Sequence, residues 1–545
     1  MAPRPTDLYP ELSWWGWGDP DQVPQLPDSV RTLLSDGLGV RGPIGRPHSP
    51  DEVPLAAPRL ASDVAAQLTD VVGAAHATGE HEARVRHARG KSTPDLLRLR
   101  GGDPLTAPDL VLWPGSHDEV LALLRICSQE RVAVVPFGGG TSVVGGLDPE
   151  TTGFAGLVAV DLRRMNALVS LDEESRLAEL EPGLRGPQAE ELLAARGYTI
   201  GHFPQSFQYA TLGGFAAARS SGQASAGYGR FDEVVMGLKV ATPAGSLVLG
   251  RAPKSAAGPD LRQLFLGSEG TLGVITSLTV QVRPVPERRV YSGWRFSTFA
   301  EGTAALRRLA QDGPVPTVLR LSDEAETALN LARPAELAQG AGPGGCLAVV
   351  GYEGAESAVE ARRAGAESVL RAMGGDPDPE AGQAWERDRY RGPYLRDALL
   401  DAGALVETLE TVAFWSRLPH VYAAVTSAVR EALSAQGTPP VILCHVSHVY
   451  PSGASLYFTV GCAALDDPVA QWQQAKAAAG DAIEGSGGSI SHHHGVGRDH
   501  LRWYQQEIGE PAGAILRAVK TQLDPAGILN PGILIPGGPS VPSGN

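Results

Sequence analysis

Cysteine is scarce in this chain, with four residues among 545. They lie far apart in the sequence, at Cys127, Cys346, Cys444 and Cys462. Disulfide frameworks and zinc ribbons both need closely spaced cysteines, so both classes are excluded. We therefore interpret the four side chains as reduced thiols.

Positive charge is also in deficit, because 46 Lys and Arg residues stand against 61 Asp and Glu residues, a net charge of −15. Such a charge repels phosphate backbones, so we expect no nucleic-acid partner. The chain also lacks a run of about 18 apolar residues and a basic region followed by an apolar stretch, as a membrane span and a signal peptide would need. We expect a cytoplasmic protein that can also bind a membrane surface peripherally.

What the chain does contain is a globular balance, with 43% hydrophobic and 20% charged residues. A chain of this length is expected to form two or more domains. An aromatic cluster stands near its start, at Trp14, Trp15 and Trp17. Such a cluster can enter a membrane interface, but we favour a hydrophobic plug packed against the rest of the protein.

A strand, helix and strand pattern leads into a glycine-rich loop. A strand is predicted from Leu110 to Trp113, a capping box from Ser116 and Glu119, and a second buried strand over 132–135. The loop that follows contains three glycines and two hydroxyl residues, in the run PFGGGTS at 136–142. Glycine lets backbone N–H groups approach an anion closely, although the loop matches neither the Rossmann nor the Walker pattern.

Two further segments are rich in Gly, Ser and Thr, at 211–222 and 267–273. One glycine-rich turn is usually only a turn, but three of them suggest loops that enclose one long ligand, and a dinucleotide has that length.

After residues 283–287 the composition changes to Ala-rich helical patterns, which predicts a domain boundary.

Five segments in chain order carry a resemblance to a known family. They are PFGGGTSVVGGL, QSFQYATLGGF, LGSEGTLGVITSLTVQVRPVPE, YLRDALL and GGSISHHHGVG. With these segments, the chain resembles the family of alkyldihydroxyacetonephosphate synthases, which are flavoproteins of the vanillyl-alcohol oxidase superfamily. The two glycine-rich loops identify only the superfamily, whereas the triple histidine is much more specific.

The resemblance implies an α+β fold, with a two-subdomain FAD-binding fold of the vanillyl-alcohol oxidase type and an antiparallel-sheet α+β cap domain. It divides the chain into four parts: an N-terminal helical and irregular region (1–104), an FAD-binding domain (105–285), a cap or substrate domain (286–480) and a C-terminal segment that completes the active site (481–545).

The resemblance also implies that FAD lies across four loops. Related enzymes tether the flavin through a histidine in or near the first loop, and this loop has none, so non-covalent FAD is implied. The implied FAD-binding residues are Pro136, Phe137, Gly138, Gly139, Gly140, Thr141, Ser142, Gln205, Ser206, Phe207, Gln208, Tyr209, Ala210, Thr211, Ala218, Arg219, Ser220, Ser221, Glu269, Gly270, Thr271, Leu272, Gly273, Val274 and Ile275.

His492, His493 and His494 form an unusual run. In an extended chain neighbouring side chains point to opposite faces, so three such rings would not easily hold one ion. A neutral imidazole both donates and accepts a proton, which suits proton transfer beside a flavin. The residues alone leave a surface patch, a weak metal site and catalysis open, and the resemblance favours catalysis.

A metal alternative exists around His445 and His448. Flavin-linked 2-hydroxyacid dehydrogenases place an H-x-G-D-G-N-x-H metal motif in a comparable position, but here the acidic residue is missing and Tyr457 stands near the second histidine position. We therefore predict no metal. The resemblance implies that Tyr457 is an acid or base, although a tyrosine in an apolar strand is by default a core residue. His445 replaces an arginine of the animal enzymes.

Arg396 and Arg320 fit two functionally important arginines of the family. A guanidinium makes paired charge-assisted hydrogen bonds to a phosphate ester, so Arg396 is implied to bind substrate phosphate and Arg320 to support the site. An ordinary ion pair with Asp397 or Asp323 is the alternative for each.

The activity implied is the exchange of the acyl chain of 1-acyl-dihydroxyacetone phosphate for a long-chain fatty alcohol, a step of ether lipid synthesis without net oxidation. Its partners are these lipid substrates and a second copy of the chain in a homodimer. Two alternatives remain: an FAD-dependent 2-hydroxyacid or alcohol dehydrogenase or oxidase, and a flavin-binding protein without turnover. The second is the less favoured, because Tyr457, Arg396 and the triple histidine are intact.

Overall fold

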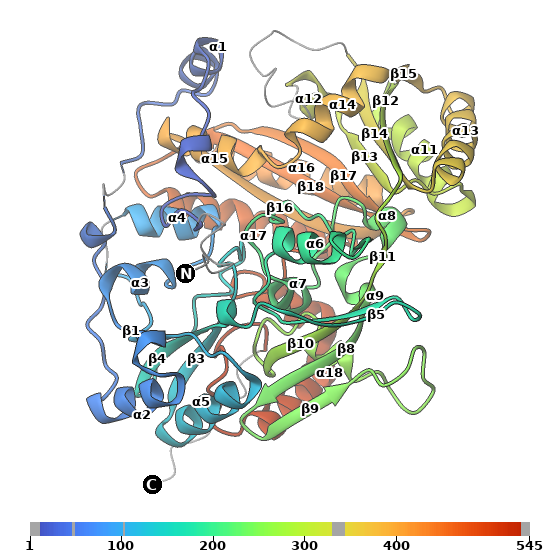
Figure 1. The fold of residues 1–545 in the computed structure, drawn as a ribbon. Helices are drawn as coiled ribbons and strands as arrows, with labels where there is room; N and C mark the ends of the chain where they lie inside the picture. The colour runs from blue at the N-terminus through green and yellow to red at the C-terminus, as the bar shows by residue number, and fades with distance from the viewer. Residues whose placement is uncertain (1–10, 46–48, 102–103, 330–343, 536–545) are drawn as a thin grey trace.

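The computed structural model describes residues 11–45, 49–101, 104–329 and 344–535. The N-terminal region runs along one side of the molecule, in blue in Figure 1, and contains short helices. Trp14 and Trp17 are 8% and 5% exposed, which confirms the hydrophobic plug. The elements of this region are η2 (Pro20–Gln22), α1 (Asp28–Thr32), η3 (Leu33–Gly37), η4 (Pro50–Glu52), α2 (Ser62–Val72), η5 (Ala74–His76), α3 (His81–Arg86) and α4 (Thr93–Arg100).

The first sheet has the order β1, β2, β4, β3, and its last three strands are parallel. The predicted strand, helix and strand are present, and Ser116 caps α5 by accepting the Glu119 N–H at 3.2 Å. The second hydrogen bond of the predicted capping box, from the Ser116 N–H to the Glu119 carboxylate, is wrong, because this carboxylate accepts the Gly115 N–H instead. The elements are β1 (Ala77–Thr78), β2 (Leu110–Leu112), α5 (His117–Glu130), β3 (Val132–Phe137) and β4 (Gly156–Asp161).

The second sheet is antiparallel, in the order β5, β6, β10, β8, β9. Its core contains the buried rings of Phe215, Phe231 and Phe265, and the long C-terminal helix α18 lies across it in Figure 1. The elements are η6 (Leu162–Arg164), β5 (Leu168–Asp172), β6 (Leu177–Leu180), α6 (Gly186–Ala194), β7 (Tyr198–Thr199), α7 (Leu212–Ala217), α8 (Ser225–Tyr228), α9 (Phe231–Val234), β8 (Val235–Thr242), β9 (Gly245–Leu249), α10 (Arg262–Phe265), β10 (Val274–Gln281), β11 (Arg283–Pro284) and α18 (Leu501–Leu523).

The third sheet is antiparallel, as the resemblance implied for the cap, in the order β15, β12, β14, β13, β17, β18, β16. Helices pack against it around a large apolar core. The division of the chain at 104, 285 and 480 stays a prediction, and position 480 falls inside α17. The elements are β12 (Arg288–Phe296), α11 (Phe299–Asp312), β13 (Val318–Ser322), α12 (Glu324–Ala328), β14 (Cys346–Gly354), α13 (Glu356–Ala372), β15 (Asp376–Asp378), α14 (Pro379–Asp388), α15 (Gly392–Asp401), β16 (Ala404–Phe414), α16 (Leu418–Ala435), β17 (Val441–Val449), β18 (Gly453–Ala463) and α17 (Pro468–Ser486).

The register of this cap sheet aligns polar residues from four strands. Tyr457 on β18 lies opposite both Glu410 on β16 and His445 on β17, and His445 lies opposite Ser322 on β13. Side chains of directly opposed residues share one face of a sheet. The register therefore builds one polar row from segments that are far apart in the sequence.

Candidate active site

A cavity of about 550 Å³ has walls from both the glycine-rich loop and the cap sheet. Most of the predicted site residues line it. They are Pro136, Phe137, Gly138, Gly139, Gly140, Thr141, Ser142, Gln205, Ser206, Ala210, Thr211, Ala218, Ser220, Ser221, Glu269, Gly270, Gly273, Val274, Ile275, Arg320, Arg396, Tyr457, His493 and His494. The three glycine-rich segments thus meet at one space, as a long ligand requires.

The remaining predicted residues do not line this cavity. The Arg219 guanidinium donates to the carbonyls of Leu266 and Gln263, at 2.8 and 3.1 Å. The Thr271 hydroxyl donates to the Ser268 carbonyl at 2.7 Å. Their roles toward FAD stay predictions, as do those of the other members of this group, which are Phe207, Gln208, Tyr209, Leu272 and the catalytic candidate His492.

The glycine-rich loop packs tightly against the segment from Tyr209 to Thr211. A Cβ atom at Gly138 would collide with the Thr211 hydroxyl, and one at Gly139 would collide with the Tyr209 carbonyl. Gly140 has φ +68°, a conformation that glycine adopts without strain. Glycine is therefore needed here for both space and backbone shape, and the loop forms a narrow wall of the cavity.

Asn530 is a cavity residue that sequence reasoning missed. Its side-chain amide donates to the carbonyls of Gly146 and Glu269, at 3.0 and 2.8 Å. Its Oδ1 is buried and has no hydrogen-bond partner in the described part of the chain. A buried acceptor without a partner is costly unless a ligand supplies a donor, and the hydroxyl and amino groups of FAD are such donors. The cavity residues therefore fit FAD, and an asparagine before a proline signals only a turn in the sequence.

Glu269 joins two of the predicted segments. Its carboxylate accepts the N–H groups of Gly497 and Val496, at 2.9 and 3.3 Å from Oε2. Burial raises the pKa of this carboxyl to about 7. The loop at 267–273 is thereby attached to the end of the triple-histidine segment.

The triple histidine is not extended, so the argument that its side chains point to opposite faces is wrong. The chain bends around Glu410, whose carboxylate accepts the backbone N–H groups of His492, His493 and His494 at 2.8 to 3.0 Å. Burial by itself would raise the pKa of this carboxyl, but the histidine rings and N–H groups hold it well below its usual range. Glu410 was missed because it lies on β16, far from the histidines in the sequence.

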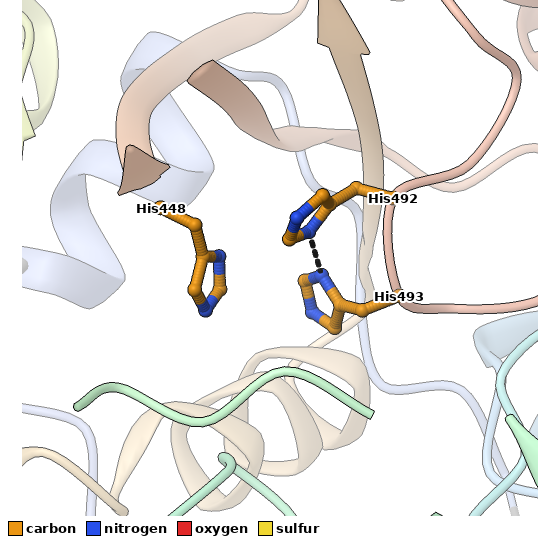
Figure 2. A group of neighbouring side chains, drawn as sticks. All are labelled: His448, His492 and His493. Atoms are coloured by element: carbon orange, nitrogen blue, oxygen red, sulfur yellow. Dashed lines mark hydrogen bonds between the residues drawn. The ribbon is translucent and has the colours of Figure 1, made fainter. Parts of the chain in front are cut away.

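The bend brings histidine rings together (Figure 2). His492 Nδ1 lies 2.9 Å from His493 Nδ1, and His492 Nε2 lies 2.7 Å from the Tyr450 hydroxyl. The His448 ring faces this pair, and one ring nitrogen from each of the three histidines lies within 4.8 Å of the others. Burial lowers the pKa of all three imidazoles. Neutral rings joined in this way form a chain along which a proton can pass from the cavity wall at His493 to Tyr450.

Tyr457 contacts one histidine of the polar row, His445, and one of the triple-histidine segment, His493. Its ring stacks on His445 and on His493, with centroid distances of 4.9 and 6.3 Å. Burial raises the pKa of its phenol to about 12, so the hydroxyl stays protonated at neutral pH. A protonated phenol beside neutral imidazoles is suited to donate a proton.

Both predicted arginines line the cavity, and both have carboxylate partners. Arg396 Nη2 lies 3.1 Å from the buried Asp397 and its Nη1 donates to the Lys91 carbonyl at 2.6 Å. Arg320 pairs with Glu326, while Asp323 instead caps α12 by accepting the Glu326 N–H. The alternative pair between Arg320 and Asp323 is thus replaced by one with Glu326.

We expect Glu410→Gln to lower the free energy of unfolding by about 3 kcal/mol near pH 7, because a carboxylate that accepts several N–H groups is lost. The wild-type carboxyl has its pKa held below the usual 4.5 in the folded state. Its stabilisation is therefore complete above pH 4.5 and declines as the pH falls below that value. Chemical denaturation of both proteins at several pH values measures this difference.

Glu407→Gln is the matched control, since Glu407 is also buried on β16 but burial raises the pKa of its carboxyl. The stability of wild type relative to this control should fall as the pH rises above 4.5. Parallel pH dependence for the two variants would contradict the role of Glu410.

Comparison with known proteins defines the class first. Residues 108–249 match the family model described as an FAD binding domain, and residues 285–534 match that of the FAD linked oxidases, C-terminal domain. The chain is therefore an FAD-dependent enzyme with the predicted α+β fold.

The particular family follows from full-length relatives. The chain is 32% identical to alkyldihydroxyacetonephosphate synthase of Dictyostelium discoideum, over 97% of this chain and 94% of that protein. It is 31% identical to the synthase of the same name from Trypanosoma brucei brucei, over 98% and 94%. A solved alkyldihydroxyacetonephosphate synthase superposes with a TM-score of 0.82 at 29% identity, over 96% of this chain and 99% of that chain. The chain belongs to the alkyldihydroxyacetonephosphate synthase family, and the two alternative functions are not favoured.

Proposed function

We propose that this protein exchanges the acyl chain of 1-acyl-dihydroxyacetone phosphate for a long-chain alcohol and releases a fatty acid. The observation that supports this most is a single cavity that joins the glycine-rich loop to Tyr457, His493 and two arginines. Such a space can hold a dinucleotide at one end and a phosphate ester at the other. Full-length similarity to synthases of this name supports the same activity.

The site residues have separate roles in this proposal. Arg396 binds the substrate phosphate and Arg320 supports the site, because both arginines line the cavity. When bound, FAD supplies an electrophilic ring, and the exchange involves no net oxidation. His493 and His494 accept a proton from the substrate carbon, and His492 carries it onward to Tyr450. Tyr457 donates its phenol proton back to that carbon at the end of the exchange, which balances the proton removed.

The test is to incubate the purified protein with 1-acyl-dihydroxyacetone phosphate and labelled hexadecanol. We expect label in an ether lipid, with no oxygen consumption and no dye reduction. Rapid bleaching of the flavin by lactate, glycolate or 2-hydroxyglutarate, without ether formation, would instead identify a dehydrogenase.

We infer that the lipid chain lies along apolar residues of the N-terminal region and α15. The residues that support this line the cavity, and they are Val30, Leu33, Leu34, Leu38, Leu395 and Leu399. No helix in the ranges that the structure describes is long and apolar enough to cross a bilayer. We also propose that the protein contacts membranes peripherally, which vesicle flotation tests. We further propose that it forms a homodimer, which analytical ultracentrifugation tests.

FAD should leave the protein when the chain is denatured, since the loop at 136–142 contains no histidine to tether it. Acid precipitation followed by absorbance of the supernatant and the pellet measures this. Yellow colour that stays with the precipitated chain would show a covalent bond instead.

Metal chelation should leave ether formation unchanged. His492 and His493 already share a hydrogen bond through their Nδ1 atoms, and no carboxylate belongs to the three-histidine group. Dialysis against EDTA, followed by the hexadecanol assay, measures this. A loss of activity that added Zn²⁺ restores would show that His448 and its neighbours hold a functional metal.

A further inference from the structure

Glu326 lines the same cavity and contacts two other cavity residues at once. It is 1% exposed, on the short helix α12. Its Oε1 accepts a hydrogen bond from Arg320 Nη2, and its Oε2 lies 2.9 Å from His445 Nδ1. The Ser322 hydroxyl also donates to Oε1 at 2.9 Å. A buried carboxylate with this many donors fixes the orientation of both cavity side chains.

The carboxylate also decides which nitrogen of His445 carries the proton. Burial would raise the pKa of Glu326, but its contacts with His445, Arg320 and Ser322 hold that pKa below its usual range. Burial and Arg320 lower the pKa of the His445 imidazole, so the ring is neutral. Arg320 Nη2 also lies near His445 Nδ1, at 3.2 Å, but a guanidinium can only donate. The ionised Glu326 oxygen is nearer, at 2.9 Å, and accepts a ring N–H. Nδ1 therefore donates to Glu326, and Nε2 keeps its lone pair.

The His445 side chain that carries this lone pair belongs to the cavity wall, beside Tyr457. His445 and Tyr457 both line the cavity, and their rings stack with an angle of 19°. His445 Nε2 makes no hydrogen bond to any residue that the structure describes. A neutral imidazole whose Nδ1 donates to a carboxylate and whose Nε2 keeps its lone pair has the arrangement of a general base.

We propose that His445, held in place by Glu326, is the base that takes the hydroxyl proton of the incoming long-chain alcohol. The alcohol O–H bond breaks and its proton forms a bond to Nε2. The alcohol oxygen forms the new C–O bond at the substrate carbon that loses the fatty-acid carboxylate. The imidazolium is stabilised by Glu326 until its proton passes to solvent. His445 is a catalytic residue and Glu326 a positioning residue, and both roles rest on the proposed exchange activity.

The experiment compares wild type, His445→Gln and Glu326→Gln with bound FAD, using labelled hexadecanol and 2,2-difluorohexadecanol. We expect His445→Gln to lower ether formation from hexadecanol by about 10²-fold. The loss should be smaller with the difluoro alcohol, because its more acidic hydroxyl depends less on a base. The KM for acyl-dihydroxyacetone phosphate should change little.

Glu326→Gln should lower the rate by about 10-fold and shift the low-pH limb of the rate profile to lower pH, because Glu326 raises the pKa of His445. A merely structural role would not move that limb. Tyr422→Phe is the control, since it removes a hydrogen bond to Asp323, the cap of α12, without contacting Glu326. FAD content and melting temperature are measured for each variant.

The outcomes separate the two proposals. Equal losses with both alcohols, or a large rise in the KM for the phosphate substrate alone, would overturn the base and indicate an anion-binding role for His445. Ether formation at the wild-type rate in His445→Gln would overturn this inference and leave the exchange activity standing. Wild type that forms no ether would overturn the exchange activity, and this inference with it.

Discussion

Tyr457→Phe should lower turnover by about 10²-fold or more while FAD content and melting temperature stay unchanged. The substitution keeps the ring that stacks on His445 and His493, and deletes only the hydroxyl. That hydroxyl stays protonated because burial raises the pKa of the phenol to about 12. A positioned acid contributes about 10²-fold to 10⁴-fold, so its loss appears in kcat. Steady-state ether formation, absorbance of bound FAD and thermal melting measure the three quantities.

Tyr352→Phe is the matched control, because Tyr352 is fully buried in the cap core and does not line the cavity. Removing that hydroxyl should leave turnover near the wild-type value. If Tyr457→Phe retains normal turnover, Tyr457 is a core tyrosine with one polar atom and has no role in proton transfer.

Gly139→Asp should yield a protein that purifies with little or no FAD. The new Cβ would collide with the Tyr209 carbonyl and the Ala210 Cα, which are backbone atoms that cannot swing aside. The loop must therefore move, and overpacking of this kind costs about 1–3 kcal/mol. The added carboxylate also places negative charge beside the wall where a pyrophosphate would lie. The ratio of flavin to protein absorbance after gel filtration measures the loss.

Gly485→Asp supplies the comparison, since Gly485 is exposed and a Cβ there meets no atom within 4 Å. It adds the same charge without moving the loop, so FAD content should match wild type. Circular dichroism checks that Gly139→Asp is still folded. A folded Gly139→Asp protein with full FAD content would show that the glycine-rich loop does not bind the cofactor.

Local sequence patterns predicted the elements that depend on neighbours in the chain. The alternation and length of apolar runs predicted β2, α5 and β3. The spacing of apolar residues that are close in the sequence indicates which side of a strand or helix is buried. Three consecutive glycines predicted a tight loop because few other residues adopt its backbone shape. Repeated Gly, Ser and Thr segments predicted that distant loops share one ligand, and those segments do line one cavity.

Local patterns failed where one residue acts on a distant one. The bend at His492 depends on Glu410, which is 82 residues earlier in the chain. The tautomer of His445 depends on Glu326, which is 119 residues earlier. Each glutamate appears in the sequence as an ordinary acidic residue. Only the tertiary structure buries each carboxylate against its partners.

Propensity and periodicity in the amino-acid sequence predicted the first strands, the helix between them and the glycine-rich loop, because these are local properties. The class of fold and most of the candidate site residues came from the resemblance of its motifs to a known family. The tertiary structure alone decided which of those residues face one another. Strand register in the cap sheet brings Glu410, Tyr457 and His445 into one row, and a shift by one residue would turn each side chain to the opposite face. That register results from packing across the whole sheet, which no short stretch of sequence specifies.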